Sequence, residues 1–171
     1  MSEPMNWQFD VDGCKEVRFH EAGHAVGAIV LGIGLLPKGI EVKSNCDAAT
    51  HVRELPVNEQ TADWCLRRAA VKLSGGAAEI RIRSQVFHPD TFQSECHYLR
   101  DFNEARELLW QFEAYGNECQ PLRVDHNLNK ALVMAHNVIA ENWSHVEKVA
   151  QTLISKAALS ASEISTILGL R

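Results

Sequence analysis

Apolar residues recur at a helical spacing close to the N-terminus. The positions that fit a period of 3.6 residues are Val17, Ala22, Ala25, Val26, Ile29, Val30 and Ile33. Gly32, Gly34 and Pro37 follow, and residues of these types end helices. The pattern predicts a helix from about residue 15 to about residue 33.

The pattern then changes to short alternating runs. "KGIEVKS", with Ile40 and Val42 on one face, predicts a short strand, and "AATHVREL" predicts a second, weaker one. A helical pattern returns over residues 60–83, with Asn58 as its expected cap.

The sequence after residue 83 has a mainly helical pattern. The loop "FHPDTFQSE" precedes a helix over residues 94–114, and the turn "NECQPLR" precedes one over residues 124–142. Ser144-x-x-Glu147 and Ser160-x-x-Glu163 have the spacing of capping boxes, and each predicts the start of a further helix. We therefore expect a mainly α fold with a small β-element near residues 39–53. It should form one domain over residues 1–171, with residues 1–14 as an N-terminal extension.

Composition and charge narrow the function classes. The net charge of −5 argues against a nucleic-acid partner, since phosphate binding needs a basic face. The closest basic group, Arg67, Arg68 and Lys72, is expected on a solvated helix face. The most apolar run, residues 25–37, is too short to span a bilayer, so no membrane span is expected.

The cysteines suggest a compartment. The five stand at positions 14, 46, 65, 96 and 119, and none forms a C-x-x-C pair. An odd and widely spaced set favours reduced thiols, and the acidic start of the chain lacks the apolar core of a signal peptide. We expect a cytoplasmic protein.

The stretch "HEAGH" carries the strongest chemical signal. His20 and His24 are four residues apart, so on a helix both imidazoles project from one face and could hold one metal ion. Glu21 lies about 100° around the same helix, where it could reach a water on the metal without being a ligand. This is the H-E-x-x-H arrangement of zinc peptidases. The alternative is a pair of core histidines that are hydrogen-bonded to backbone groups.

A catalytic zinc needs a third protein ligand and an open position. No histidine follows His24 at the spacing that would complete the site locally, so the third ligand must be distant. From the residues alone the candidates are Glu79, Asp90, Glu95, His97, Asp101 and Glu104.

Three blocks in order resemble one known family. "FHEAGHAV", "LSGGAAE" and "DFNEARELL", followed by the C-terminal helical pattern, resemble the peptidase domain of the FtsH family of ATP-dependent zinc metalloproteases over about residues 17–168. The resemblance implies an FtsH-like helical bundle with an H-E-x-x-H helix. It implies one Zn²⁺ per chain, held by His20, His24 and Asp101, with Glu21 as the general base.

The resemblance also suggests supporting roles. Glu79 would accept an imidazole N–H instead of binding the metal. Gly75 and Gly76 would permit close approach of the H-E-x-x-H helix, with Gly23 opposite; a mere kink is the alternative. Ile40, Glu41, Val42 and Lys43 occupy the position of the family's active-site edge strand, where an extended substrate would add by β-augmentation.

The chain also departs from the family. It has no G-x-x-x-x-G-K-[ST] motif for an ATPase, and "CHYLRD" replaces a small turn, which leaves the role of His97 and Tyr98 undecided. The expected function is a zinc metalloendopeptidase that hydrolyses unfolded proteins or peptides without ATP. The alternatives are a non-catalytic peptide- or protein-binding module that contains the metal, and a peptidase subunit that works as a homo-oligomer or beside a separate ATPase.

Overall fold

The structure is a computed structural model, and it describes residues 14–43, 46–83, 96–115 and 121–170. The chain is mainly helical with one small three-stranded sheet, which confirms the predicted class. The helices are α1 (Lys15–Val30), α2 (Ala62–Ile82), α4 (Cys96–Tyr115), α5 (Pro121–Glu141), α6 (Trp143–Ser155) and α7 (Ala161–Ile167). The strands are β1 (Leu35–Val42), β2 (Ala48–Val52) and β3 (Ala158–Leu159).

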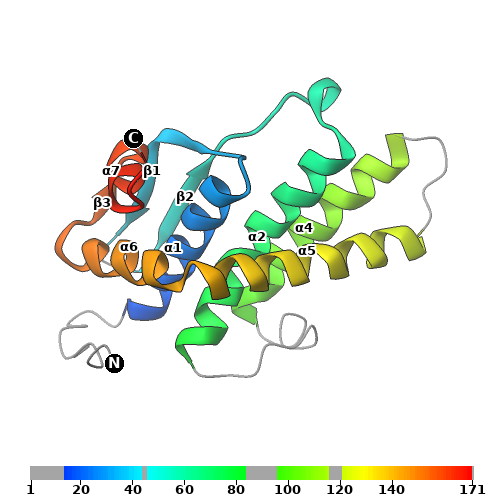
Figure 1. The fold of residues 1–171 in the computed structure, drawn as a ribbon. Helices are drawn as coiled ribbons and strands as arrows, with labels where there is room; N and C mark the ends of the chain where they lie inside the picture. Colours follow the sequence, from blue (N-terminus) through cyan, green and yellow to red (C-terminus); the bar gives the residue numbers. More distant parts are fainter. Residues whose placement is uncertain (1–13, 44–45, 84–95, 116–120, 171) are drawn as a thin grey trace.

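Helix α2 lies at the centre of the helical part. It packs against α1, α4 and α5, while α1 also packs against α6 and the sheet (Figure 1). The side of α2 that meets these helices is made of small and apolar residues, among them Ala69, Ala70, Leu73 and Ala78, all fully buried. One helix thus contacts both of the helices that carry the candidate metal ligands.

Helix α1 ends earlier than the apolar pattern predicts. Gly32 and Gly34 have φ values of +71° and +84°, a left-handed conformation that glycine adopts without strain. The chain leaves the helix there, so Ile33 is buried in the core from outside the helix.

The helix starts are partly as predicted. Ser160 and Glu163 form the expected capping box at the start of α7. The predicted box at Ser144 and Glu147 is wrong, because α6 begins one residue before Ser144 and has no side-chain cap.

The cap of α2 and the start of α5 also differ from the prediction. Asn58 is not the cap of α2: it lies in a short 3₁₀ turn (Val57–Glu59), and the Thr61 hydroxyl accepts the N–H of Trp64 instead. Helix α5 begins at Pro121, inside the predicted turn, where the missing N–H of proline leaves no helical bond unmade. The predicted loop over residues 87–95 lies outside the described residues.

The sheet has the order β2-β1-β3, so β1 is its central strand. Ile40 pairs with Thr50 on one side and with Leu159 on the other, and Glu41 pairs with Ala49 and Ala158. Val42 pairs with Ala48 and donates its N–H to the carbonyl of Ala157. The prediction that Ile40–Lys43 forms an edge strand is therefore wrong, because β3, which the apolar pattern of the C-terminal region did not reveal, covers the second side.

A disulfide joins Cys14, the residue before α1, to Cys46 in the β1–β2 turn, with a Cα–Cα distance of 5.3 Å. The expectation of reduced thiols is wrong for this pair. Cys14 is fully buried and belongs to the core rather than to an N-terminal extension. Cys65 is a free, buried thiol, and burial raises its pKa to about 11. A disulfide argues mildly against a reducing compartment, so the cytoplasmic location stays a prediction.

Among the described residues, no helix is both long and apolar enough to cross a lipid bilayer.

Candidate metal centre

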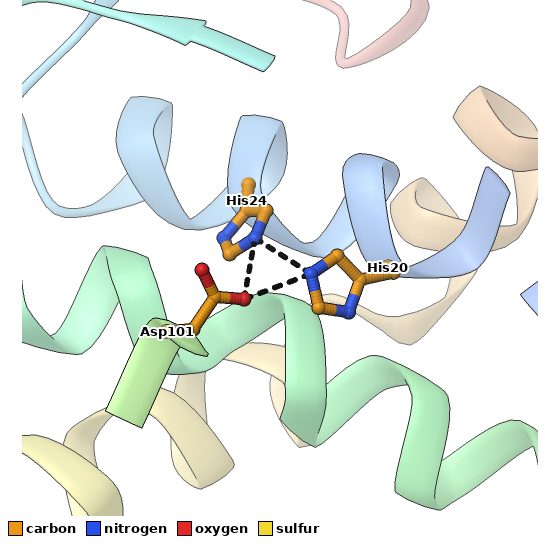
Figure 2. A group of neighbouring side chains, drawn as sticks. All are labelled: His20, His24 and Asp101. Atoms are coloured by element: carbon orange, nitrogen blue, oxygen red, sulfur yellow. Dashed lines mark hydrogen bonds and ion pairs between the residues drawn. The ribbon is translucent and has the colours of Figure 1, made fainter. Parts of the chain in front are cut away.

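Three side chains from two helices converge at one point. His20 and His24 project from α1, and Asp101 projects from α4 (Figure 2). The Oδ2 atom of Asp101 lies 2.9 Å from Nε2 of His20 and 3.3 Å from Nε2 of His24. The two Nε2 atoms are 3.0 Å apart. Within the described part of the chain, these three residues are identified as a group that could hold a metal ion.

Helix α2 holds the far nitrogen of both imidazoles. The Nδ1 atom of His20 lies 3.2 Å from Oε2 of Glu79, and Nδ1 of His24 lies 2.8 Å from the carbonyl oxygen of Val71. Both acceptors require a hydrogen on Nδ1, so in the neutral rings the lone pair is on Nε2. Helix α2 therefore turns both lone pairs toward Asp101.

A cation between the three atoms would stabilise this arrangement. Two imidazole lone pairs and a carboxylate oxygen repel one another at about 3 Å unless a positive charge lies between them. Ligands about 2.0–2.1 Å from a tetrahedral zinc ion would be roughly 3.3 Å apart. The distances of 2.9, 3.0 and 3.3 Å are within a few tenths of an ångström of that spacing.

Without a metal, a proton takes this place. Burial lowers the pKa of His20, but hydrogen bonds to Asp101 and Glu79 outweigh burial and raise the pKa to about 10. Burial raises the pKa of Asp101, but the charges and hydrogen bonds of His24 and His20 outweigh burial and hold the pKa well below its usual range. The site thus prefers an anionic carboxylate beside a positive charge.

Glu21 lies beside this group and is not one of its three members. Its side chain is buried, and the Thr50 hydroxyl lies 2.6 Å from its Oε2 atom and 3.0 Å from its backbone carbonyl oxygen. Thr50 is on β2, so the sheet holds the carboxylate of Glu21. Sequence reasoning missed Thr50, because nothing local in the second strand indicates a contact with α1.

Two glycines set the distance between α1 and α2. A Cβ atom at Gly23 would lie 2.5 Å from the carbonyl oxygen of Ser74, so the two backbones meet there. A Cβ atom at Gly75 would lie 2.5 Å from Nε2 of His24 and 2.8 Å from Nε2 of His20. The two backbones approach closely at Gly23, as predicted, whereas at Gly75 the approaching group is the pair of imidazoles and not the backbone of α1. Gly76 is buried in the same helix.

The group formed by His20, His24 and Asp101 opens into a cleft of about 320 Å³. Its wall includes Glu21 and residues of β2, and it also includes three cationic side chains, Arg68, Lys72 and Arg100. The sequence led us to expect Arg67, Arg68 and Lys72 on a solvated helix face. This expectation is wrong for two of them, because Arg68 is buried against Glu54 and Lys72 faces the cleft. Lys72 precedes Gly75 by three residues on α2, a spacing that could have placed it near the site.

Of the other predicted residues, some lie at the cleft and some do not. Glu79 takes the supporting position described above, and Glu104 lines the cleft but pairs with Lys72. Ile40–Lys43 do not line the cleft; Ala48, Ala49, Thr50 and Val52 of β2 do. Asp90 and Glu95, and the side chains of His97 and Tyr98, lie outside the described residues.

Comparison of the chain with protein-family models and with curated proteins finds no match.

Proposed function

We propose that the chain is a zinc-dependent metalloendopeptidase with an FtsH-peptidase-like fold, one that hydrolyses unfolded proteins or peptides without an ATPase module in the same chain. The observation that carries the proposal is the convergence of two Nε2 lone pairs and one carboxylate oxygen, beside a buried glutamate that is not part of the group. The three sequence blocks that resemble the FtsH peptidase domain support it.

The residues present fit a zinc ion. His20, His24 and Asp101 would hold it, and Glu79 and the Val71 carbonyl would orient the imidazoles. When bound, zinc lowers the pKa of a water to about 7 and polarises the carbonyl to be attacked. Glu21 would take the proton of that water and pass it to the leaving amine, and Thr50 would hold the carboxylate in position.

Strand β2 replaces β1 as the proposed substrate strand. Within the part of the chain that the structure describes it is an edge strand, and four of its residues line the cleft next to the His20–His24–Asp101 group. An extended peptide could pair with its open edge through main-chain hydrogen bonds. Recognition of this kind tolerates many side chains but requires an extended chain, which favours unfolded substrates.

Cleavage of an unfolded protein in the absence of ATP tests the proposal. Zinc-loaded wild type should cut, a chelator should stop it, and Glu21→Gln should reduce kcat by roughly 10²–10⁴-fold while zinc stays bound, because the general base is lost. Glu16→Gln, in the first turn of the same helix, is the matched control and should leave the rate unchanged.

The other outcomes separate the alternatives. Zinc binding without cleavage by the chain alone would contradict an autonomous peptidase and leave the binding module or the subunit of a separate ATPase. Cleavage that survives Glu21→Gln would contradict the assigned base.

A further inference from the structure

The wall of the cleft contains an ion pair that lies about one helical turn along α2 and α4 from the residues of the His20–His24–Asp101 group. Lys72 precedes Gly75 by three residues on α2, and Gly75 lies under the two imidazoles. Glu104 follows Asp101 by three residues on α4. The Lys72 ammonium lies 2.6 Å from Oε2 of Glu104, and both residues line the cleft. One turn of helix rises about 5.4 Å, so this pair lies close to the place where a peptide bond would be cut.

Together with Arg100, this pair carries a surplus of one positive charge. Arg100 lies 2.9 Å from the other oxygen of Glu104, so two cations share a single carboxylate. Lys72 is only 23% exposed, so its charge is less screened by solvent than that of Arg100, which is 85% exposed. Of the two cations that pair with Glu104, Lys72 is therefore the one that a ligand in the cleft would contact more strongly.

The net charge of the whole cleft would also be positive once a metal is bound. Its lining contains three cations, Arg68, Lys72 and Arg100, and three ionisable carboxylates, from Glu21, Asp101 and Glu104, and Glu54 adds a fourth carboxylate because it pairs with Arg68. A divalent ion would add two positive charges and leave this set with a net positive charge. A cationic cleft in a chain of net charge −5 attracts anionic ligands to this place in particular.

We propose that Lys72, assisted by Arg100, binds a carboxylate group of the peptide substrate, so that cleavage is selective for peptides with an acid next to the scissile bond. The inference rests on the proposed function and names its substrate class. Extended chain spans about 3.3 Å per residue, which places the carboxylate one or two residues from the cut bond. It would come from an Asp or Glu side chain or from the C-terminus of the substrate.

Binding to a chain that cannot turn over tests the inference apart from catalysis. Zinc-loaded Glu21→Gln would be titrated with three fluorescent peptides that differ at one group: an amidated peptide with glutamine, the same peptide with glutamate, and the glutamine peptide with a free C-terminal carboxylate. We expect at least one acidic peptide to bind about tenfold or more tightly than the neutral peptide, as for a charge-assisted hydrogen bond. The acidic peptide that binds more tightly identifies the source of the carboxylate.

Variants then test whether Lys72 causes the tighter binding of acidic peptides. Lys72→Met should reduce the preference to within about threefold, because one charge-assisted contact is lost. Lys72→Glu should reverse it toward a lysine peptide. Lys148→Met, at an exposed position on α6, should leave it unchanged. Zinc binding and thermal unfolding would show that each variant is folded, and in an active wild type the change should appear in KM rather than in kcat.

Equal binding of all three peptides, a preference that survives Lys72→Met, or no peptide binding would each overturn the inference. A carboxylate preference in a chain that shows no hydrolysis would support the cleft assignment while rejecting the proposed peptidase.

Discussion

Each imidazole of the candidate metal centre is held by two different kinds of contact. Glu79 and the Val71 carbonyl bind the Nδ1 atoms, and the Nε2 atoms face Asp101. The alternative interpretation of the sequence was a pair of core histidines bound to backbone groups. Only the Nδ1 atom of His24 has such a contact, with the Val71 carbonyl. The Nε2 atoms of both rings face the Asp101 carboxylate, where a metal ion or, without one, a proton on His20 can lie between them.

The raised pKa of His20 predicts how the stability of the metal-free protein depends on pH. A proton binds His20 more tightly in the folded chain than in the unfolded chain, so its stabilising contribution is fully present below pH 6.5 and is lost as pH rises toward about 10. The lowered pKa of Asp101 acts at the acidic end: its contribution is present above its usual value of 3.8 and lost as pH falls below it. Between pH 6.5 and about 10, the free energy of unfolding of the metal-free protein should therefore decrease.

Urea unfolding of chelator-treated protein across this interval measures the effect. His20→Gln should flatten the dependence, and zinc should flatten it too, because the ion displaces the proton and releases it to solvent. A metal-free wild type whose stability is constant or rising over the interval would contradict the assignment.

At the scale of elements, the contact between α1 and α2 determines the geometry of the site. Gly23 allows the two backbones to meet, and Gly75 leaves space for the imidazoles. The double glycine in "LSGGAAE" and the glycine in "HEAGH" could be read from the sequence as a close approach. Their different neighbours, a carbonyl oxygen at one and two rings at the other, could not.

Alanine at the two positions should therefore have different effects. Gly23→Ala places a methyl group against the Ser74 carbonyl, which cannot rotate away, so the free energy of unfolding should fall by about 1–3 kcal/mol, as for an overpacked core. Gly75→Ala instead displaces two imidazole rings, so zinc affinity should fall by roughly 10–100-fold or more with a smaller effect on stability.

Competition with a chromophoric chelator and denaturant unfolding would measure the two quantities on both variants. A Gly75→Ala variant that binds zinc like the wild type would show that the rings do not occupy this position.

At the scale of the whole molecule, the disulfide links the start of the site helix to the hairpin that carries Thr50. Cys14 and Cys46 are 32 residues apart and enclose all of α1 and β1. The loop fixes the hairpin over the same helix that holds His20, Glu21 and His24. Thr50 reaches Glu21 from this hairpin.

Removal of the disulfide should destabilise the fold. In the chain-entropy account, cross-linking a loop of this length restricts the unfolded chain by about 3–4 kcal/mol, so Cys14→Ser/Cys46→Ser should lower the free energy of unfolding by about that amount. Dithiothreitol should do the same to the wild type and have no effect on the double variant. A wild type that is equally stable with and without reductant, and that shows two additional free thiols in both states, would contradict the disulfide.

Short-range spacing in the sequence determined the mainly helical class, the face shared by His20 and His24, and the capping box at Ser160. A helix repeats every 3.6 residues whatever surrounds it, so residues four apart meet without help from the rest of the chain. Asp101, 77 residues beyond His24, could be chosen from the candidates only through the family resemblance.

The tertiary structure decided everything that depends on distant segments. It brought Glu79 to His20 across 59 residues and Thr50 to Glu21 across 29, and it placed Lys72 in the cleft rather than in solvent. Among the described strands, it also placed β2 at an edge of the sheet, because β3 pairs with β1 from near the C-terminus. Contacts between distant segments depend on which helix and strand surfaces pack together, and the period of one segment contains no information about its partner.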